Sequence, residues 1–493
     1  MSTKRLFLVV LVGLLALIPC LAQGYDADII VVGSGLTGHA ATYSALEQGA
    51  KVIWIEKNPV LGGETAIASG TYPAPDSTMQ RERGIVDSKE LFIQDINRIG
   101  HNKADQNILR TFAEKVTGVW EWFVKSGLEV DNKRGPVIDT VHSVFSVART
   151  VGPVGSGSAY TNFLYKKMEP FKDRLTVLLN TKATSLVMED GRIKGVQVIS
   201  ALGNKTIRAK AVILATGGYG SSKEMIREYS PKYSEVVTVT LPWATGDGHR
   251  MAAAVGAQLV NMDYICGYFG GMPKGPGEYF VGFPDLVSGA ADRWFGEIWV
   301  NQRGERFINE DDGDEDPREV ALNEQPDLES VIIFDQGMVD FNKRFPISNF
   351  EKRLETNSYA VKKFDTIEAL CAGFGLPVDQ VKLEIAATNA DFKAGRVDTF
   401  GKKPAAAFSK GPYYGILNRG TIFMTAGGIK IDAGTRVLDH NNQWIPGLYA
   451  AGEAIGSMQV AGIGIIGGTG TSPPLVFGME AGKNAFMESK LVK

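Results

Sequence analysis

The chain has 493 residues, of which 44% are hydrophobic and 22% are charged, as in an ordinary globular protein. This length predicts two or three domains rather than one. The formal net charge of −3 argues against a nucleic-acid-binding protein.

The N-terminal segment has the pattern of a secretory signal peptide. Lys4 and Arg5 precede an apolar run at residues 6–22, which ends in the small residue Ala22. We therefore expect a leader over residues 1–22 and a periplasmic or secreted protein, without stable membrane insertion after leader removal. The alternative is a leader that is retained as a membrane anchor.

A glycine-rich turn joins the first predicted strand, residues 27–32, to a helix. Gly33, Gly35 and Gly38 have the GxGxxG spacing of dinucleotide-binding turns. The first glycine permits the tight turn, the second lets a pyrophosphate approach the backbone, and the third lets helix and strand pack closely. The N-terminus of the helix would then present N–H groups and a partial positive charge to the phosphates.

The second predicted strand ends at an acidic residue. The helix stops at Gly49, and the apolar run that follows it ends at Glu56. This carboxylate comes about 20 residues after the glycine turn, where an acid would bind ribose hydroxyls. Strand, glycine turn, helix, strand and acid together predict a dinucleotide-binding unit.

Further on, residues 89–127 have helical periodicity, and residues 175–200 are predicted to form two strands, a turn and a third strand.

Four later segments point to the identity of the dinucleotide. They are GGETAIASGT at 62–71, LATGG at 214–218, TGDG at 245–248 and AAGE at 450–453. In this order the chain resembles the flavoproteins of the fumarate reductase/succinate dehydrogenase family over residues 27–485, in the soluble form and without haem. The resemblance implies FAD as cofactor. It also implies an α/β fold, with a Rossmann-like, GR2-type FAD-binding domain and an inserted α+β capping domain.

The resemblance also suggests domain boundaries. We expect the first part of the FAD-binding domain at 25–249 and its second part at 425–493. The capping domain, which would hold the substrate, is expected at 250–424.

The same resemblance assigns residues to FAD. Glu453 is expected to contact the ribityl chain, and the backbone near Ala183 the adenine. The last glycine loop leads into a helix whose N-terminus would face the pyrimidine end of the flavin and favour the reduced form. The expected FAD-binding residues are Gly33, Gly35, Leu36, Thr37, Gly38, Glu56, Lys57, Gly63, Glu64, Thr65, Ser69, Gly70, Ala183, Ala215, Thr216, Gly217, Asp247, Glu453, Gly470 and Thr471.

Non-covalent attachment of FAD is expected. Family members with covalent FAD carry a histidine shortly after the Gly-Gly pair, whereas here Gly63 is followed by Glu64 and Thr65. His39 lies in the first helix and is expected to be a packing or phosphate-side residue rather than a catalytic one.

Cysteine and histidine spacing predicts no metal site and no haem. The cysteines are Cys20, Cys266 and Cys371, no CxxC motif occurs, and no two histidines have metal-ligand spacing. The sequence leaves open whether Cys266 and Cys371 form a disulfide or remain two thiols. Without a haem or a second nucleotide motif, we expect electrons from a separate donor such as a cytochrome or flavoprotein.

The substrate positions depart from the family pattern. Fumarate reductases of this family bind two carboxylates with histidine and arginine, and two of these positions read Met424 and Ile465 here. A dicarboxylate would lose charge-assisted hydrogen bonds, which contribute about 1.5–3 kcal/mol each. We therefore expect a flatter and less charged substrate than fumarate.

Three residues are candidates for moving a proton. Tyr268 aligns near the histidine of the relatives' capping domain, and a phenol can act as an acid; the alternative is a core tyrosine. Arg293 aligns with an arginine of the family's proton relay, or is a plain ion-pairing residue. Arg318 follows the position of the family's donor arginine, which reads Asp314 here, and the acidic loop around it favours a solvated segment.

Together these features predict an exported FAD-dependent oxidoreductase acting on CH–CH groups. The expected reaction is reduction of an activated carbon–carbon double bond, of enone or acrylate type, by hydride transfer from flavin N5. The partners would be a small-molecule substrate and the electron donor, and no nucleic acid. The alternatives are a dehydrogenase of a ketosteroid-like apolar ring and a flavin electron-transfer subunit with a degenerate active site.

Overall fold

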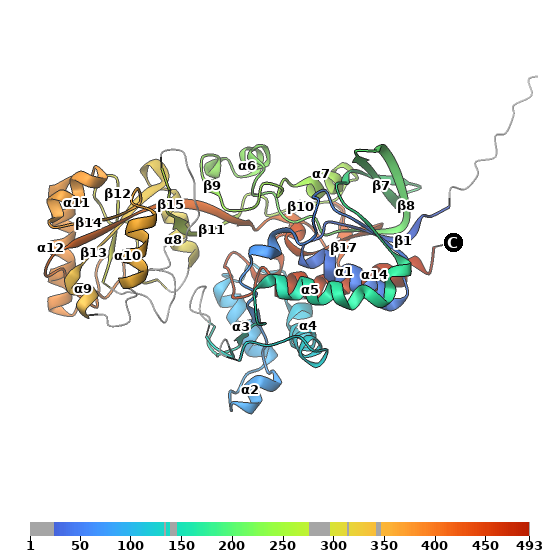
Figure 1. The fold of residues 1–493 in the computed structure, drawn as a ribbon, viewed down its shortest axis with the longest axis horizontal. Helices are drawn as coiled ribbons and strands as arrows, with labels where there is room; N and C mark the ends of the chain where they lie inside the picture. Colours follow the sequence, from blue (N-terminus) through green and yellow to red (C-terminus); the bar gives the residue numbers. More distant parts are fainter. Residues whose placement is uncertain are drawn as a thin grey trace, which may run out of the picture.

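The computed structural model describes residues 24–132, 135–138, 145–275, 296–312, 315–341 and 347–492. They form a larger α/β body, which holds the C-terminus, and a smaller body, here called the cap, reached through long extended strands (Figure 1). The predicted leader lies outside the described residues. No helix in the described part of the chain combines the length and apolar character needed to cross a membrane.

The larger body is built on an eight-stranded sheet with a parallel centre. The parallel strands, in spatial order, are β18 (Trp444–Ala450), β8 (Gly203–Leu214), β1 (Ala27–Val32), β2 (Val52–Ile55) and β5 (Leu175–Leu178). Val32 pairs with both Ile55 and Leu214, so the central strands end together at one edge. Ligands of open parallel sheets bind at the carboxyl ends of the strands, and the candidate site is therefore expected at this edge.

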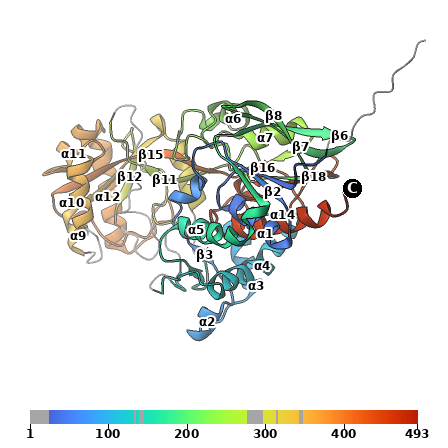
Figure 2. The same ribbon diagram turned by 45° about the vertical axis from the view of Figure 1, so that its right-hand side comes forward.

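Two helices from opposite ends of the sequence pack on each other beside this sheet. They are α1 (Leu36–Gln48) and α14 (Ser472–Ser489), which lie side by side in both ribbon views (Figure 2). Gly482 of α14 is close enough that a Cβ there would lie 2.3 Å from the carbonyl oxygen of Ala41. The close contact thus requires glycine, and it joins the beginning of the chain to its end.

The secondary structure predicted for residues 175–200 is confirmed. After β5 come β6 (Lys182–Glu189) and β7 (Arg192–Ser200), which pair in antiparallel fashion with each other, and β7 pairs with the first half of β8. The helical stretch predicted at 89–127 is two helices, α3 (Lys89–Ile99) and α4 (Gln106–Lys125). The side chain of Asp105 caps α4 by accepting from two backbone N–H groups, which starts a new helix there.

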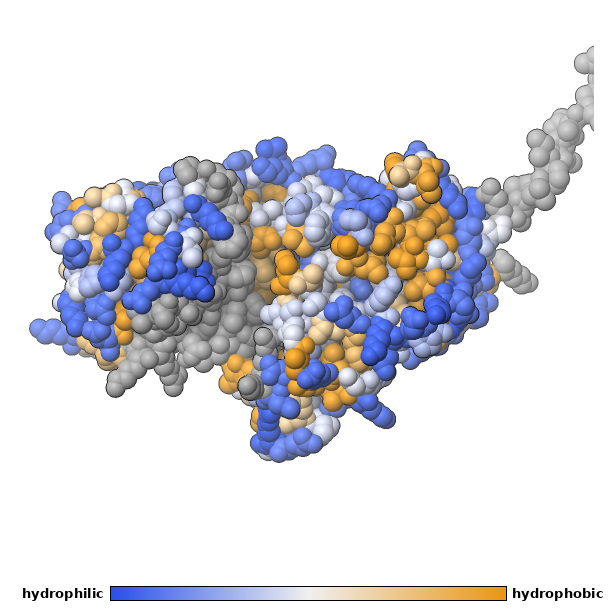
Figure 3. All heavy atoms as spheres, in the orientation of Figure 1, coloured by the Kyte–Doolittle hydropathy of each residue, from blue (hydrophilic) through white to orange (hydrophobic). Residues whose placement is uncertain are grey.

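Shorter elements complete the larger body. They are β3 (Tyr72–Pro73), β4 (Thr150–Val151), β10 (Leu259–Val260), β16 (Gly428–Ile429), β17 (Arg436–Leu438), α2 (Thr78–Glu82), α5 (Gly157–Met168), α6 (Lys223–Tyr229), α7 (Asp247–Ala254) and α13 (Met458–Ala461). In Figure 3 hydrophobic residues gather on this body, in the region of β7 and β8, where Ile199 and Leu202 are exposed.

The cap contains a six-stranded, mainly antiparallel sheet with its own apolar core. Its strands are β9 (Val237–Thr238), β11 (Ile265–Gly271), β12 (Ile298–Asn301), β13 (Glu329–Asp335), β14 (Val361–Phe364) and β15 (Tyr413–Thr425). The helices of this region are α8 (Glu315–Asn323), α9 (Gln336–Phe341), α10 (Ile347–Thr356), α11 (Ile367–Phe374) and α12 (Val378–Ala394). Strand β15 runs from the cap toward the larger body (Figure 1).

The chain passes between the two bodies at positions that differ from the expected boundary at 250. Strand β9 already pairs with β15 in the cap sheet. Helix α7 follows it in sequence, yet its residues Met251 and Ala252 are buried in the core of the larger body. After α7, strand β10 still pairs with β16 of the larger body, and the chain enters the cap sheet again only at β11.

Candidate active site

A cavity of about 680 Å³ opens at the carboxyl ends of β1, β2 and β8. Its volume is in the range of small-molecule and cofactor sites, about 300–1,000 Å³. The lining comes from separate parts of the chain: residues 32–37, 55–58, 63–71, 181–183, 215–217, 239–251, 423–424, 452–460 and 469–474 contribute to it. Only the tertiary fold brings these segments together.

The glycine turn combines two packing glycines with one that leaves open space. A Cβ at Gly33 would lie 2.2 Å from the carbonyl oxygen of Ala215, and one at Gly38 would lie 2.0 Å from that of Gly33. Gly35 is different, because a Cβ there would meet only Thr65 Oγ1, at 3.8 Å. The space in front of Gly35 therefore belongs to the cavity, at the N-terminus of α1.

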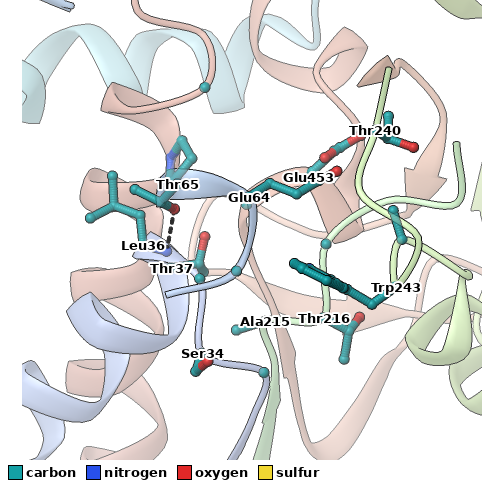
Figure 4. Close-up of a pocket in the computed structure, with 18 of the residues that line it drawn as sticks. Ser34, Leu36, Thr37, Glu64, Thr65, Ala215, Thr216, Thr240, Trp243 and Glu453 are labelled. Atoms are coloured by element: carbon teal, nitrogen blue, oxygen red, sulfur yellow. Dashed lines mark hydrogen bonds between the residues drawn. The ribbon is translucent and has the colours of Figure 1, made fainter. Parts of the chain in front are cut away.

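Two side chains hold the turn in place. The Glu56 carboxylate accepts hydrogen bonds from the backbone N–H of Ser34 at 3.0 Å and from its hydroxyl at 2.6 Å. The backbone N–H of Leu36 donates to Thr65 Oγ1 at 2.9 Å, as the dashed line in Figure 4 shows. The acid at the end of β2 thus anchors the glycine loop as well as lining the cavity.

A charged network lies at the side of the cavity formed by β2 and β6. Lys57 Nζ lies 2.8 Å from an Asp247 carboxylate oxygen, and Lys182 Nζ lies 3.0 Å from the other. Burial by itself would raise the pKa of Asp247, but the hydrogen bonds from the two lysines lower it below its usual value. Lys57 also donates to the hydroxyl of Thr245 at 3.0 Å. The network ties residues 243–247 to the sheet edge.

One part of the cavity lining is apolar. Phe423 and Met424 of β15 line it. Met424 is buried in one cluster with Cys266 and Met458, and Ile465 belongs to the same cluster. The two positions where the sequence lacks the family's histidine and arginine therefore lie in one hydrophobic cluster, here called the apolar wall, and Met424 is the member of this pair that lines the cavity.

Two glutamates face each other in the wall of the cavity. Glu64 lies in the 3-10 helix η1 (Gly63–Ile67) and Glu453 in η5 (Gly452–Ile455), and Figure 4 shows their side chains extending toward one another. Burial and the negative charge of Glu453 raise the pKa of Glu64 to about 8. Burial likewise raises the pKa of Glu453.

The donor groups of this cavity fit FAD. Thr216 Oγ1 is buried in the lining and has no hydrogen-bond partner among the described residues, so it is available to a bound molecule. A Cβ at Gly217 or Gly470 would have no atom within 4 Å in the protein, which leaves room for a ligand against the backbone. Glycine backbone, hydroxyls and a helix N-terminus are the groups that bind a dinucleotide.

Most of the residues expected to bind FAD line this cavity, but three do not. Gly38 packs on Gly33, and Gly70 would carry a Cβ only 2.8 Å from the backbone of Ser156. Thr471 donates to the carbonyl oxygen of Gly468 at 3.1 Å. These three support the walls of the cavity. Their predicted contacts with FAD, like those of the lining residues, stay predictions.

The candidate proton donors have different placements. Tyr268 lies in β11, and its backbone pairs with Thr421 of β15. Arg293 and Asp314 lie outside the described residues. Arg318 lies in α8 and is completely buried, donating to the carbonyl oxygen of Glu310 at 3.4 Å. The acidic segment is thus not simply a solvated loop at this point, because Arg318 packs into the cap.

Two residues of the cavity lining, in the segment directly before TGDG, were not predicted from the sequence. Thr240 and Trp243 line the cavity, and Figure 4 shows the indole of Trp243 reaching into it. Their position directly before a recognised nucleotide segment was the signal that could have indicated them.

His39, Cys266 and Cys371 have structural roles. His39 is 2% exposed, its Nδ1 lies 3.1 Å from the Gly35 carbonyl oxygen, and its ring meets that of Trp54 edge-on. Burial lowers the pKa of His39 to about 4, so it packs as a neutral ring. Both cysteines are buried, and they form no disulfide with each other.

Comparison with known proteins shows what the chain is similar to. The family described as FAD binding domain matches residues 28–469. Urocanate reductase of Eggerthella lenta is 32% identical over 469 residues, covering 93% of this chain and 74% of that protein. Vinyl phenol reductase of Lactiplantibacillus plantarum is 31% identical over 474 residues, covering 88% of this chain and 90% of that protein. The solved open conformation of a flavocytochrome c3 fumarate reductase is 29% identical with a TM-score of 0.76, covering 94% of this chain and 79% of that one.

Proposed function

Because this chain belongs to the family of FAD-binding flavoproteins and is an FAD-dependent oxidoreductase, we propose that it is an exported reductase of an activated carbon–carbon double bond, of enone or acrylate type. The sequence-based prediction of this family, of its α/β fold and of FAD as cofactor is confirmed. The relatives named for urocanate and vinyl phenol support the class of reaction, since a vinyl group is itself a carbon–carbon double bond.

The observation that carries the substrate proposal is the apolar wall formed around Met424 and Ile465. Both side chains are at most 8% exposed and share a cluster with Cys266 and Met458. A dicarboxylate placed against this wall would be desolvated without cationic partners, which costs free energy. A flat conjugated molecule would instead gain from burial of its apolar surface.

The residues around the cavity have distinct roles in this proposal. When bound, FAD supplies the hydride. Helix α14 begins at Ser472, and Pro473 and Pro474 of its first turn line the cavity. The positive end of the helix dipole therefore faces the cavity, where it favours negative charge. Phe423 and Met424 exclude water from the apolar end, and Tyr268 is proposed to donate the proton, with Arg293 and Arg318 as candidates for relaying it.

The proposal is tested by reoxidation of the reduced enzyme. The flavin is reduced anaerobically and mixed with a panel of enones and aryl acrylates, and its absorbance near 450 nm is followed. Recovery of the oxidised flavin with formation of the saturated product supports the proposal. Reoxidation by none of the panel would favour an electron-transfer subunit. Reduction of the oxidised flavin by a saturated ring ketone would favour the dehydrogenase.

Fumarate is expected to leave the reduced flavin unchanged. The reason is the hydrophobic wall, in which Ile465 and Met424 occupy the positions of the family's arginine and histidine. Millimolar fumarate is mixed anaerobically with reduced enzyme, and the absorbance is followed over minutes. Rapid reoxidation would show that other residues bind the carboxylates, and would contradict the assignment of these two positions.

FAD is expected to be released by acid precipitation. Covalent members carry a histidine shortly after the Gly-Gly pair, and none follows Gly63 in this segment, so we propose non-covalent attachment. After precipitation and centrifugation, the yellow chromophore should be in the supernatant, and mass spectrometry of the pellet should give the mass of the unmodified polypeptide. A flavin-sized increase in that mass would overturn this expectation.

A further inference from the structure

We propose that Glu64 and Glu453 form a proton-binding site in the wall of the FAD cavity, in which two carboxyl groups share one proton. We further propose that FAD binds tightly only while this proton is held. The inference concerns the cofactor site and holds whichever substrate the enzyme reduces, so its failure would leave the proposed reaction untouched.

The geometry holds the two carboxyl groups together. The backbone N–H of Leu241 donates to Glu64 Oε1 at 2.8 Å. The backbone N–H of Thr425 donates to Glu453 Oε1 at 2.9 Å, and its hydroxyl lies 3.1 Å from the same oxygen. The two side chains extend toward one another in Figure 4, and each influences the pKa of the other. Carboxyl groups that meet in this way can hydrogen-bond to each other only when one of them carries a proton.

The surroundings contain little that would neutralise a second negative charge. The leading influences on the two pKa values are burial, the neighbouring carboxyl and hydrogen bonds from Leu241, Thr425 and Gly218, and no lysine or arginine of the described chain is among them. Tyr219 is an ionisable neighbour of the pair. Burial and the charge of Glu453 raise the pKa of Tyr219, so its phenol stays neutral. Two like charges in a buried site cannot both ionise readily.

Burial and mutual repulsion therefore keep one proton on the pair near neutral pH. The pKa of Glu64, about 8, marks where that proton is lost. Below this pH the pair carries one negative charge, and above it two. The FAD diphosphate brings two further negative charges into the same cavity. Losing the proton should therefore weaken FAD binding, and bound FAD should in turn make the proton harder to remove.

The first experiment is a titration of apoprotein with FAD between about pH 6 and 9.5 at constant ionic strength. Wild-type affinity should be constant below about pH 8 and fall by up to about tenfold per pH unit above it, as expected for uptake of one proton. Glu64→Gln, which mimics the protonated carboxyl, should remove this pH dependence, whatever its own affinity for FAD. Glu169→Gln is the matched control, because the Glu169 side chain is 71% exposed and pairs with Lys172 on the surface; it should follow the wild type.

The second experiment needs no variant. Calorimetric titration of wild-type apoprotein with FAD in buffers of different ionisation enthalpy gives the number of protons taken up. We expect uptake of up to about three-quarters of a proton at about pH 8.5 and near zero at about pH 6.5. Zero uptake at both pH values, or a Glu64→Gln variant that keeps the pH dependence of the wild type, would overturn the proposal.

Discussion

Gly35→Val is expected to abolish FAD binding while the protein stays folded. Gly35 has φ −62° and ψ −173°, a backbone conformation open to any residue, and its Cβ would approach only Thr65 Oγ1, at 3.8 Å. The valine side chain would instead fill the space in front of α1, where phosphate oxygens would accept hydrogen bonds from N–H groups. Loss of two charge-assisted hydrogen bonds of about 1.5–3 kcal/mol each should raise Kd about 10²–10⁴-fold.

The measurement is FAD titration of the apoprotein, together with far-ultraviolet circular dichroism and thermal unfolding. Gly118→Val is the matched control, because Gly118 lies exposed on α4 and a Cβ there would have no atom within 4 Å. The control should bind FAD as the wild type does. If the Gly35→Val variant bound FAD with the affinity of the wild type, the phosphates of FAD would have to lie elsewhere.

Tyr268→Phe is expected to slow reoxidation of the flavin by the substrate about 10²–10⁴-fold, the usual contribution of a general acid. Strands β11 and β15, which carry Tyr268 and its backbone partner Thr421, also contribute Cys266 and Met424 to the apolar wall. The strand that carries this tyrosine thus packs against Met424, which lines the cavity. Because the ring is retained, FAD and substrate affinity should change little.

Stopped-flow reoxidation near 450 nm, with a substrate from the panel, measures this effect. Tyr359→Phe is the control, since Tyr359 is 38% exposed at the surface, and its rate should match the wild type. Arg293→Gln offers a contrast: a relay residue should slow the same step and shift its pH dependence without changing substrate affinity. An unchanged rate in Tyr268→Phe would remove the tyrosine from the mechanism and direct attention to Arg318 or a water chain.

Local sequence patterns were reliable where one short segment determines its own structure. The first strand, predicted at residues 27–32, and the glycine turn after it were predicted to the residue. The turn is specified locally, because Gly33 has φ +100° and Gly38 packs against the backbone of Gly33. The antiparallel strands on either side of the turn at Asp190 were also predicted correctly, because the strands and the turn form one continuous segment of the chain. The helical periodicity predicted at 89–127 corresponds to two helices, because Asp105 caps the second of them.

The placement of residues from different segments could not be read in this way. The burial of Arg318 depends on how α8 packs into the cap. The return of the chain to the larger body after β9 depends on Met251 and Ala252 of α7, which join the core of that body. The contribution of Trp243 to the cavity depends on the network of Lys57 and Asp247 that holds its segment at the sheet edge.

The sequence by itself determined the family, the cofactor and the fold class, because glycine turns and the strands beside them are specified by local sterics and by the close approach of a phosphate. It also indicated that the carboxylate-binding side chains of fumarate reductases are absent. Only the tertiary structure decided that Met424 and Ile465 belong to one apolar wall, and that Glu64 and Glu453 meet in the wall of the cavity. The physical reason is that the cavity is assembled from segments far apart in the chain. The charge, burial and pKa of each of its groups depend on neighbours that no local pattern names.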